Sequence, residues 1–176
     1  FALYLRTLAG GLHMHHSAED EVAFPFLRER LPDLPLEGLI DEHAQMAAIL
    51  DELSPSLAGL HGEAGEGPAL LAVRGALERL ARIWTEHIDV EEADFSVKRL
   101  EAVASAEELA GWLAEMGQHR PEDAPPDPVV LPFILHNLSA EDRAIMAQNM
   151  PPIVTEELVP IVWKEHWAPM KPFLLD

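Results

Sequence analysis

The sequence contains no cysteine among its 176 residues. This absence excludes disulfides, thiolate zinc sites, iron–sulfur clusters and cysteine nucleophiles. It fits a reducing compartment, and we expect a cytoplasmic protein. Long hydrophobic runs are also lacking, because no stretch of about 18 apolar residues occurs, so no segment is predicted to span a membrane.

Positive charge is scarce. Twelve Lys and Arg stand against 31 Asp and Glu, which gives a formal net charge of −19. A surface this acidic repels phosphate backbones and anionic lipid headgroups, so we expect neither nucleic acid nor a membrane as a partner. The sequence also lacks the GxSxG, P-loop and dinucleotide-binding motifs, so any chemistry must come from another kind of site.

Helix-forming residues dominate the sequence to about residue 118, and hairpin turn signals are scarce, which predicts an all-α fold. We expect long helices over about 2–30, 36–60 and from 68 onward. They are separated by the turn LPDLP at 31–35 and the loop HGEAGEGP at 61–68. A shorter helix over about 105–117 opens with a capping box formed by Ser105 and Glu108.

Three segments make up the predicted domain organisation. Residues 1–118 form a helical bundle, and residues 119–128 form a proline-rich linker. Residues 129–176 form a helical extension that we expect to pack on the bundle, because its apolar residues need a surface to cover.

Each long helix carries an apolar stripe with spacings of three and four residues, and each stripe is interrupted once. The interruptions are His15 and Glu19 in the first helix, His43 in the second, and His87 and Glu91 in the third. With a rise of about 1.5 Å per residue, counting from the connecting turns places them at similar depths in an antiparallel bundle. The sequence therefore predicts one polar layer inside an apolar core.

A lone core histidine is more often only hydrogen-bonded, but a whole layer of imidazoles and carboxylates is costly to bury. One or two metal ions between these groups offset that cost. Nitrogen and oxygen donors without thiolate favour iron, followed by manganese and zinc. We therefore predict a metal site whose ligands are His15, Glu19, His43, His87 and Glu91.

Four further residues are candidates for a supporting role. His16, Glu42 and Glu92 are neighbours of the predicted ligands, and each could hydrogen-bond an imidazole or supply an extra ligand. The alternative for each is a solvated position on the helix surface. His166, in the tail sequence WKEHW, is the candidate for a replacement ligand from the extension.

The strings HHSAEDEVAFPFLRER, DEHAQM and HIDVEEADF occur in this order over roughly residues 1–100. As a set they resemble the hemerythrin-like family of HHE cation-binding domains. The resemblance implies an antiparallel four-helix bundle that holds a non-haem di-iron site, with two iron ions per chain. It also implies that Glu19 and Glu91 are the bridging carboxylates.

The sequence departs from the family pattern in two places. Hemerythrins have a second histidine one turn from the one in DEHAQM, where this chain has Leu39 and Ala47. Family members also have an earlier helix that supplies another histidine, and this chain resembles a member without it. We expect the helix at 105–117 or the tail to fill that place, or a homodimer to form through the helices left exposed.

Three functions remain open at this point. The resemblance implies a module that binds O₂ or a similar small ligand, or that senses oxidants or iron. The same metal pair could serve a di-iron oxidase or oxygenase that acts on a small molecule. The third is an interaction domain whose metal site is structural or degraded. A cavity of several hundred Å³ beside the metal would favour an enzyme, and a closed core would favour a ligand the size of a gas molecule.

Overall fold

The computed structural model describes residues 1–58, 60, 66–122 and 124–175. Over these residues all regular elements are helical, and no strand occurs among them. The predicted fold class, an all-α bundle with additional C-terminal helices, is therefore confirmed. No helix in the described part of the chain has the length and apolar character needed to cross a membrane.

The chain divides into two compact units. The central unit is His13–Pro121, and the terminal unit combines Phe1–Leu12 with Glu122–Asp176. Each unit has its own apolar core.

The first predicted helix is continuous but changes its winding. It consists of α1 (Ala2–Ala18), the π-helical segment η1 (Glu19–Ala23) and α2 (Phe24–Arg30). A π-turn adds a residue per turn and so rotates the side chains that follow it relative to a regular α-helix. Pro25 lies in the first turn of α2, directly after the π-helical segment.

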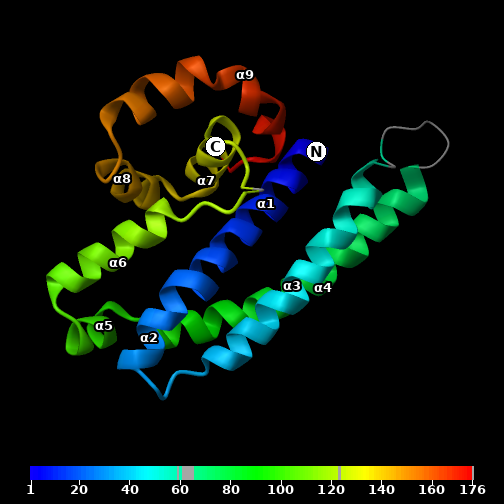
Figure 1. The fold of residues 1–176 in the computed structure, drawn as a ribbon. Helices are drawn as coiled ribbons and strands as arrows, with labels where there is room; N and C mark the ends of the chain where they lie inside the picture. The colour runs from blue at the N-terminus through cyan, green and yellow to red at the C-terminus, as the bar shows by residue number, and fades with distance from the viewer. Residues whose placement is uncertain (59, 61–65, 123, 176) are drawn as a thin grey trace. The chain divides into compact units, whose positions relative to one another are not determined.

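The second and third predicted helices are α3 (Leu36–Ala58) and α4 (Glu66–Asp94), which lie side by side as a hairpin (Figure 1). Of the loop predicted at 61–68, residues 61–65 lie outside the described residues, and the remainder belongs to α4. The predicted stripe of α3 is buried from Leu36 to Leu57, including His43. In α4 the first stripe residue, Leu70, is instead exposed.

The central unit is completed by α5 (Val97–Val103) and α6 (Ala106–Gln118). The predicted capping box is present, because the Glu108 N–H donates to the Ser105 hydroxyl and the Glu108 carboxylate accepts from the Ser105 N–H. Helix α6 packs against η1. It therefore supplies the fourth helix of the bundle.

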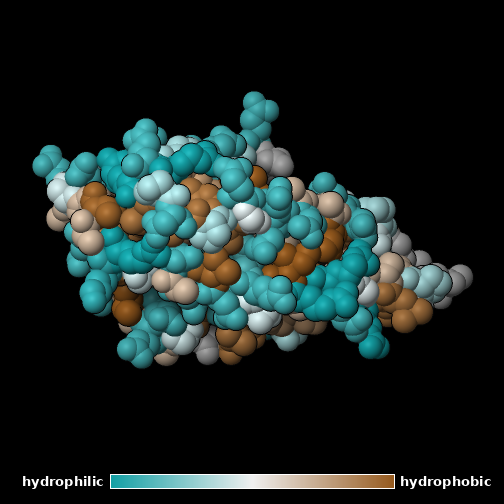
Figure 2. All heavy atoms as spheres, turned by 90° about the horizontal axis from the view of Figure 1, so that it is seen from below, coloured by the Kyte–Doolittle hydropathy of each residue, from teal (hydrophilic) through white to brown (hydrophobic). Residues whose placement is uncertain are grey.

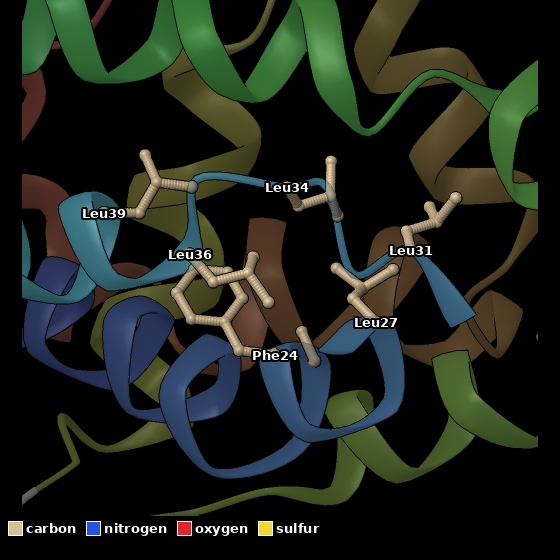
Figure 3. Packing of buried hydrophobic residues seen from close by; sticks show 7 residues of the cluster. Phe24, Leu27, Leu31, Leu34, Leu36 and Leu39 are labelled. Atoms are coloured by element: carbon tan, nitrogen blue, oxygen red, sulfur yellow. The ribbon is translucent and has the colours of Figure 1, made fainter. Parts of the chain in front are cut away.

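An apolar cluster fills one end of the central unit. Figure 3 shows side chains from α2, from the turn at 31–35 and from the start of α3 converging there. The labelled members are Phe24, Leu27, Leu31, Leu34, Leu36 and Leu39. The Phe24 ring stacks on the His43 ring with centroids 5.5 Å apart, so this cluster borders the predicted polar layer directly.

In the terminal unit, α8 (Ala140–Gln148) and the segments after it curve around α7 (Asp127–Asn137), as Figure 1 shows. Helix α7 begins at Asp127, inside the stretch predicted as a linker. The buried core contains Phe133, Trp167 and Met170. The elements are α7 (Asp127–Asn137), α8 (Ala140–Gln148), η3 (Val154–Val162), α9 (Lys164–Trp167) and η4 (Ala168–Phe173).

The face of the protein shown in Figure 2 is mostly hydrophilic, but apolar side chains interrupt it. Figure 2 shows such groups among hydrophilic side chains on the face it presents. The most exposed large apolar residues include Leu71, Val97, Ile161 and Leu175. Because such residues are common on folded proteins, their exposure alone does not indicate a partner.

Candidate metal centre

Four side chains from four helical segments meet inside the central unit. They are His16 of α1, Glu19 of η1, His43 of α3 and His87 of α4. One potential ligand atom from each lies within 4.8 Å of all the others. All four residues are buried, and His87 has no exposed surface at all. The packed helices therefore place three imidazoles and a carboxylate around one point.

A second group shares Glu19 with the first. It consists of His15, Glu19 and Glu91, again with potential ligand atoms within 4.8 Å of one another. One oxygen of Glu19, Oε1, lies 3.3 Å from His15 Nε2, and the other, Oε2, lies 3.5 Å from His43 Nε2. The Glu19 carboxylate thus presents one oxygen to each group, which is the arrangement of a carboxylate that bridges two ions.

Two carboxylates outside the cluster fix the tautomers of its central histidines. His43 Nδ1 lies 2.8 Å from Asp20 Oδ1, and His87 Nδ1 lies 2.9 Å from Glu42 Oε2. An ionised carboxylate can only accept a hydrogen bond, so both Nδ1 atoms carry the proton and donate it. Each neutral ring then points the Nε2 lone pair at the centre, as a metal-binding histidine does.

The two Nε2 atoms face each other across the centre. His43 Nε2 and His87 Nε2 are 3.2 Å apart. Two lone pairs at this separation repel unless a cation lies beside them. Two imidazole nitrogens bound at about 2.1 Å in neighbouring positions of one ion stand roughly 3 Å apart. The observed spacing therefore fits two ligands of the same ion.

Within the centre, three further buried side-chain atoms have no hydrogen-bond partner. They are His16 Nε2, Glu19 Oε2 and Glu91 Oε1. An unsatisfied buried polar group costs free energy comparable to a lost hydrogen bond, and folded proteins rarely tolerate several in one place. Because all three belong to the two groups of potential ligands, a bound cation would satisfy them together.

The pKa values of the cluster also show that burial disfavours its charged forms. Burial, followed by the charge of Glu91 and then of Asp20, raises the pKa of Glu19 to about 9. Burial likewise raises the pKa of Glu91. Burial and the neighbouring His43 lower the pKa of His16 to about 3. Without an ion, the site therefore favours neutral carboxyls and neutral imidazoles, and a cation would return the carboxyls to their charged form.

The donor set decides which ions fit. It combines imidazole nitrogens with carboxylate oxygens, and the sequence has no cysteine to add sulfur. Such mixed sets suit iron and manganese, and also zinc, whereas they are poor sites for soft ions such as Cu(I). The residues present thus fit a metal centre of the kind predicted from the sequence.

The structure brings all five predicted ligands together. His15, Glu19, His43, His87 and Glu91 all belong to one or both groups. They differ in enclosure, because the side chain of His15 is 43% exposed whereas that of Glu91 is 9% exposed. Their role as ligands stays a prediction, which their convergence supports.

His16 lies closer to the centre than the sequence analysis placed it. It is 4% exposed, and its ring stacks on that of His43 with centroids 4.1 Å apart. It had been considered as an extra ligand or a supporting residue, and its position favours a ligand. A second stripe on the first helix passes through His16 and predicts that it is buried. Its residues also follow spacings of three and four: Leu12, His16, Glu19, Ala23 and Leu27.

Some of the residues around the centre hydrogen-bond a predicted ligand, and others are exposed and do not reach it. Glu42, which the sequence made a candidate, accepts a hydrogen bond from His87. Asp20 accepts one from His43 but was not among the predicted residues, and its position directly after Glu19 was the only sequence signal for it. Glu92 is exposed on α4. His166 is exposed on α9 in the terminal unit and belongs to neither group of potential ligands among the described residues.

A surface groove of about 310 Å³ reaches the centre from outside. The rings of His16 and His43 form part of its wall, together with Asp20 of η1. Ala44 and Ala47 of α3 line its other side, where their small side chains leave the space open. The groove therefore brings external molecules up to His16 and His43, although both side chains remain almost fully buried.

Comparison with known proteins identified one family. The family model described as "Hemerythrin HHE cation binding domain" matches residues 1–98. This range contains every member of the two groups of potential ligands. No curated protein and no solved structure matched the chain.

The metal-free protein should lose stability as the pH rises from about 6.5 to about 9. In the unfolded chain Glu19 releases its proton near its ordinary pKa of 4.5, whereas the folded protein holds it to about 9. The unfolded state then binds fewer protons, so the free energy of unfolding falls by up to about 1.4 kcal/mol per pH unit. The histidines, whose pKa values are lowered, act in the opposite direction, but only below their ordinary value of 6.5.

Denaturant unfolding of chelator-treated protein at stepped pH values measures this slope. Glu19→Gln should flatten it, because the amide does not titrate. Glu92→Gln is the matched control on an exposed carboxylate and should leave the slope unchanged. An undiminished slope in the Glu19→Gln protein would contradict the assignment of the retained proton to Glu19.

Proposed function

Because the family model covers more than half of the chain, this protein belongs to the hemerythrin HHE cation-binding family, and we propose that it is a non-haem di-iron protein that binds or senses O₂ or a related oxidant. The observation that carries the proposal is the position of Glu19, which offers one oxygen to each of the two groups of potential ligands.

We assign one iron to His16, His43 and His87, and the other to His15 and Glu91, with Glu19 shared between them. Glu91 Oε1 also lies 3.2 Å from His87 Nε2, so this carboxylate can serve as a second bridge, as the resemblance implied. His15, in the second group, is more exposed than the other potential ligands, so an external ligand could approach the ion beside it.

An iron pair, when bound, supplies electrons and an open coordination position to an oxidant such as O₂. The chain's own residues prepare the site for this. Asp20 and Glu42 hold His43 and His87 in the metal-binding tautomer. The Phe24 ring, which is fully buried against His43, keeps water from one side of the layer.

A second candidate function is oxidation of a small organic molecule. The groove of about 310 Å³ favours it, because a protein that binds only a diatomic gas does not need an opening of this size. Asp20 and Ser17 line this groove and would offer polar contacts to a substrate.

Iron content and its dependence on Glu19 test the di-iron proposal. Protein purified without added metal should contain about two iron ions per chain, with near-ultraviolet charge-transfer bands that bleach on reduction and return in air. Glu19→Ala should leave less than one iron, because both groups lose a ligand. His15→Ala should keep about one, because the four-residue group remains complete.

His166→Ala is the matched control for loss of a histidine. Its side chain is exposed in the terminal unit, so both iron ions should remain. Zinc in the purified protein, or two iron ions in the Glu19→Ala protein, would refute the shared-carboxylate di-iron site.

Removing the supporting carboxylates should weaken metal binding without removing a ligand. Asp20→Asn and Glu42→Gln are each expected to lower iron affinity by about 10- to 100-fold, because the imidazole loses its charged hydrogen-bond acceptor. Competition with a chelator of known affinity measures the change. Glu92→Gln should bind iron as the unmodified protein does, and equal losses in all three variants would show a general charge effect instead.

The groove can be tested by filling it. Ala47→Phe should slow reoxidation of the reduced protein by tert-butyl hydroperoxide about ten-fold, which corresponds to about 1.4 kcal/mol, while hydrogen peroxide reacts at its normal rate. Ala48→Phe, at a neighbouring exposed position on α3 outside the groove, is the control. If Ala47→Phe does not discriminate between the two peroxides, the groove is not the route to the centre.

A further inference from the structure

The terminal unit encloses a cavity of about 400 Å³ that is separate from the metal centre. Helix α7 forms one wall, and α8, η3, α9 and η4 form the others as they curve around it. This volume lies within the range of pockets that hold small organic ligands. None of its lining residues belongs to either group of potential metal ligands.

The basic residues of the segment 122–176 all lie at this cavity. Between Glu122 and Asp176 the sequence has nine Asp and Glu but only three Lys and Arg: Arg143, Lys164 and Lys171. All three line this cavity, and the lining residues that the structure describes include no acid. The chain as a whole has a net charge of −19 and repels anions. Three basic side chains grouped at one cavity make the local electrostatic potential more positive and so favour binding of an anion there.

The three cations come from three different elements, α8, α9 and η4. Lys164 and Lys171 are exposed, so their ammonium groups are accessible at the mouth of the cavity. Arg143 is half-buried, and its Nη2 donates a hydrogen bond to the Leu138 carbonyl at 3.2 Å. Arg143 is thus anchored and adds a fixed charge, whereas the two lysines can adjust to a ligand.

The rest of the lining is largely apolar and already ordered. Leu135 and Val159 are buried, and the indole of Trp167 is held by a 2.8 Å hydrogen bond from its Nε1 to the Val159 carbonyl. The His136 ring packs on Trp167 with centroids 4.4 Å apart. Because these walls are fixed without a ligand, an apolar molecule could enter at little cost in ordering.

We propose that this cavity binds a small amphiphilic carboxylate, with the acid group at Lys164 and Lys171 and the apolar body against Leu135, Val159 and Trp167. Ammonium groups form charge-assisted hydrogen bonds with a carboxylate, and apolar walls contribute in proportion to the surface that they cover. A cationic amphiphile would meet the like charges of Lys164 and Lys171, and an inorganic anion would leave the apolar walls uncovered.

Calorimetric titration of the iron-loaded protein tests this proposal with four probes that carry the same ten-carbon chain. Decanoate should bind saturably at one site. Decanol, which lacks the charge, should bind at least about ten-fold more weakly, a difference of about 1.4 kcal/mol. Decyltrimethylammonium should not bind saturably. Decyl phosphate is included to separate a phosphate head group from a carboxylate, and tighter binding of the phosphate would overturn the choice of carboxylate.

The double variant Lys164→Gln/Lys171→Gln locates the binding. It should weaken decanoate binding at least about ten-fold and leave decanol binding unchanged. Lys98→Gln removes the chain's one other lysine, which is exposed on α5 and lies outside the cavity lining. Ala147→Phe, which narrows the cavity from α8, should weaken decanoate and decanol together.

Several outcomes would overturn the proposal. They are the absence of saturable decanoate binding below about 1 mM, equal binding of decanol or of the cationic probe, and equal losses in the double variant and in Lys98→Gln. Decanoate binding that survives the double variant but disappears when iron is chelated would place the carboxylate at the metal centre instead. Because the expected binding is independent of iron, failure of this proposal leaves the di-iron proposal untouched.

Discussion

The cost of burying charge-bearing groups without water governs the central unit. Three imidazoles and two carboxylates occupy one layer between apolar side chains, where neither the ionised nor the unpaired neutral form is stable alone. The altered pKa values of Glu19 and His16 express that cost. In a family of cation-binding domains a bound ion offsets this cost, and the apolar cluster packs against one side of the layer through Phe24.

How well the sequence predicted the site depended on the regularity of each helix. In α3 the spacing rule identified the buried face, including His43, because the helix is regular throughout. In the first helix the same rule selected His15 as the buried histidine, whereas the structure buries His16. One stripe with spacings of three and four residues passes through His15 and another through His16, so spacing alone does not select between them. The π-helical segment that begins at Glu19 then changes the phase of the side chains that follow it.

Residues that act across helices were harder to predict than residues on one stripe. The position of Asp20 directly after Glu19 is a weak signal, because the hydrogen bond that gives Asp20 its role reaches His43 on another helix. The cationic cavity of the terminal unit is a stronger case, because its lysines and arginine lie on three elements whose relative positions no local pattern specifies. Long-range packing, rather than local preference, therefore determines what the sequence alone could not supply.

The supporting carboxylates also connect the helices to one another. Glu19 and Asp20 are neighbours, and so are Glu42 and His43; in each pair one residue faces the centre and the other holds a histidine of the next helix. The first helix thereby positions the histidine of α3, and α3 positions the histidine of α4. Displacing one helix would misplace its own ligand and the next helix's histidine together. Metal binding and helix packing in this unit are consequently parts of one cooperative arrangement, in which a local change spreads through hydrogen-bonded pairs.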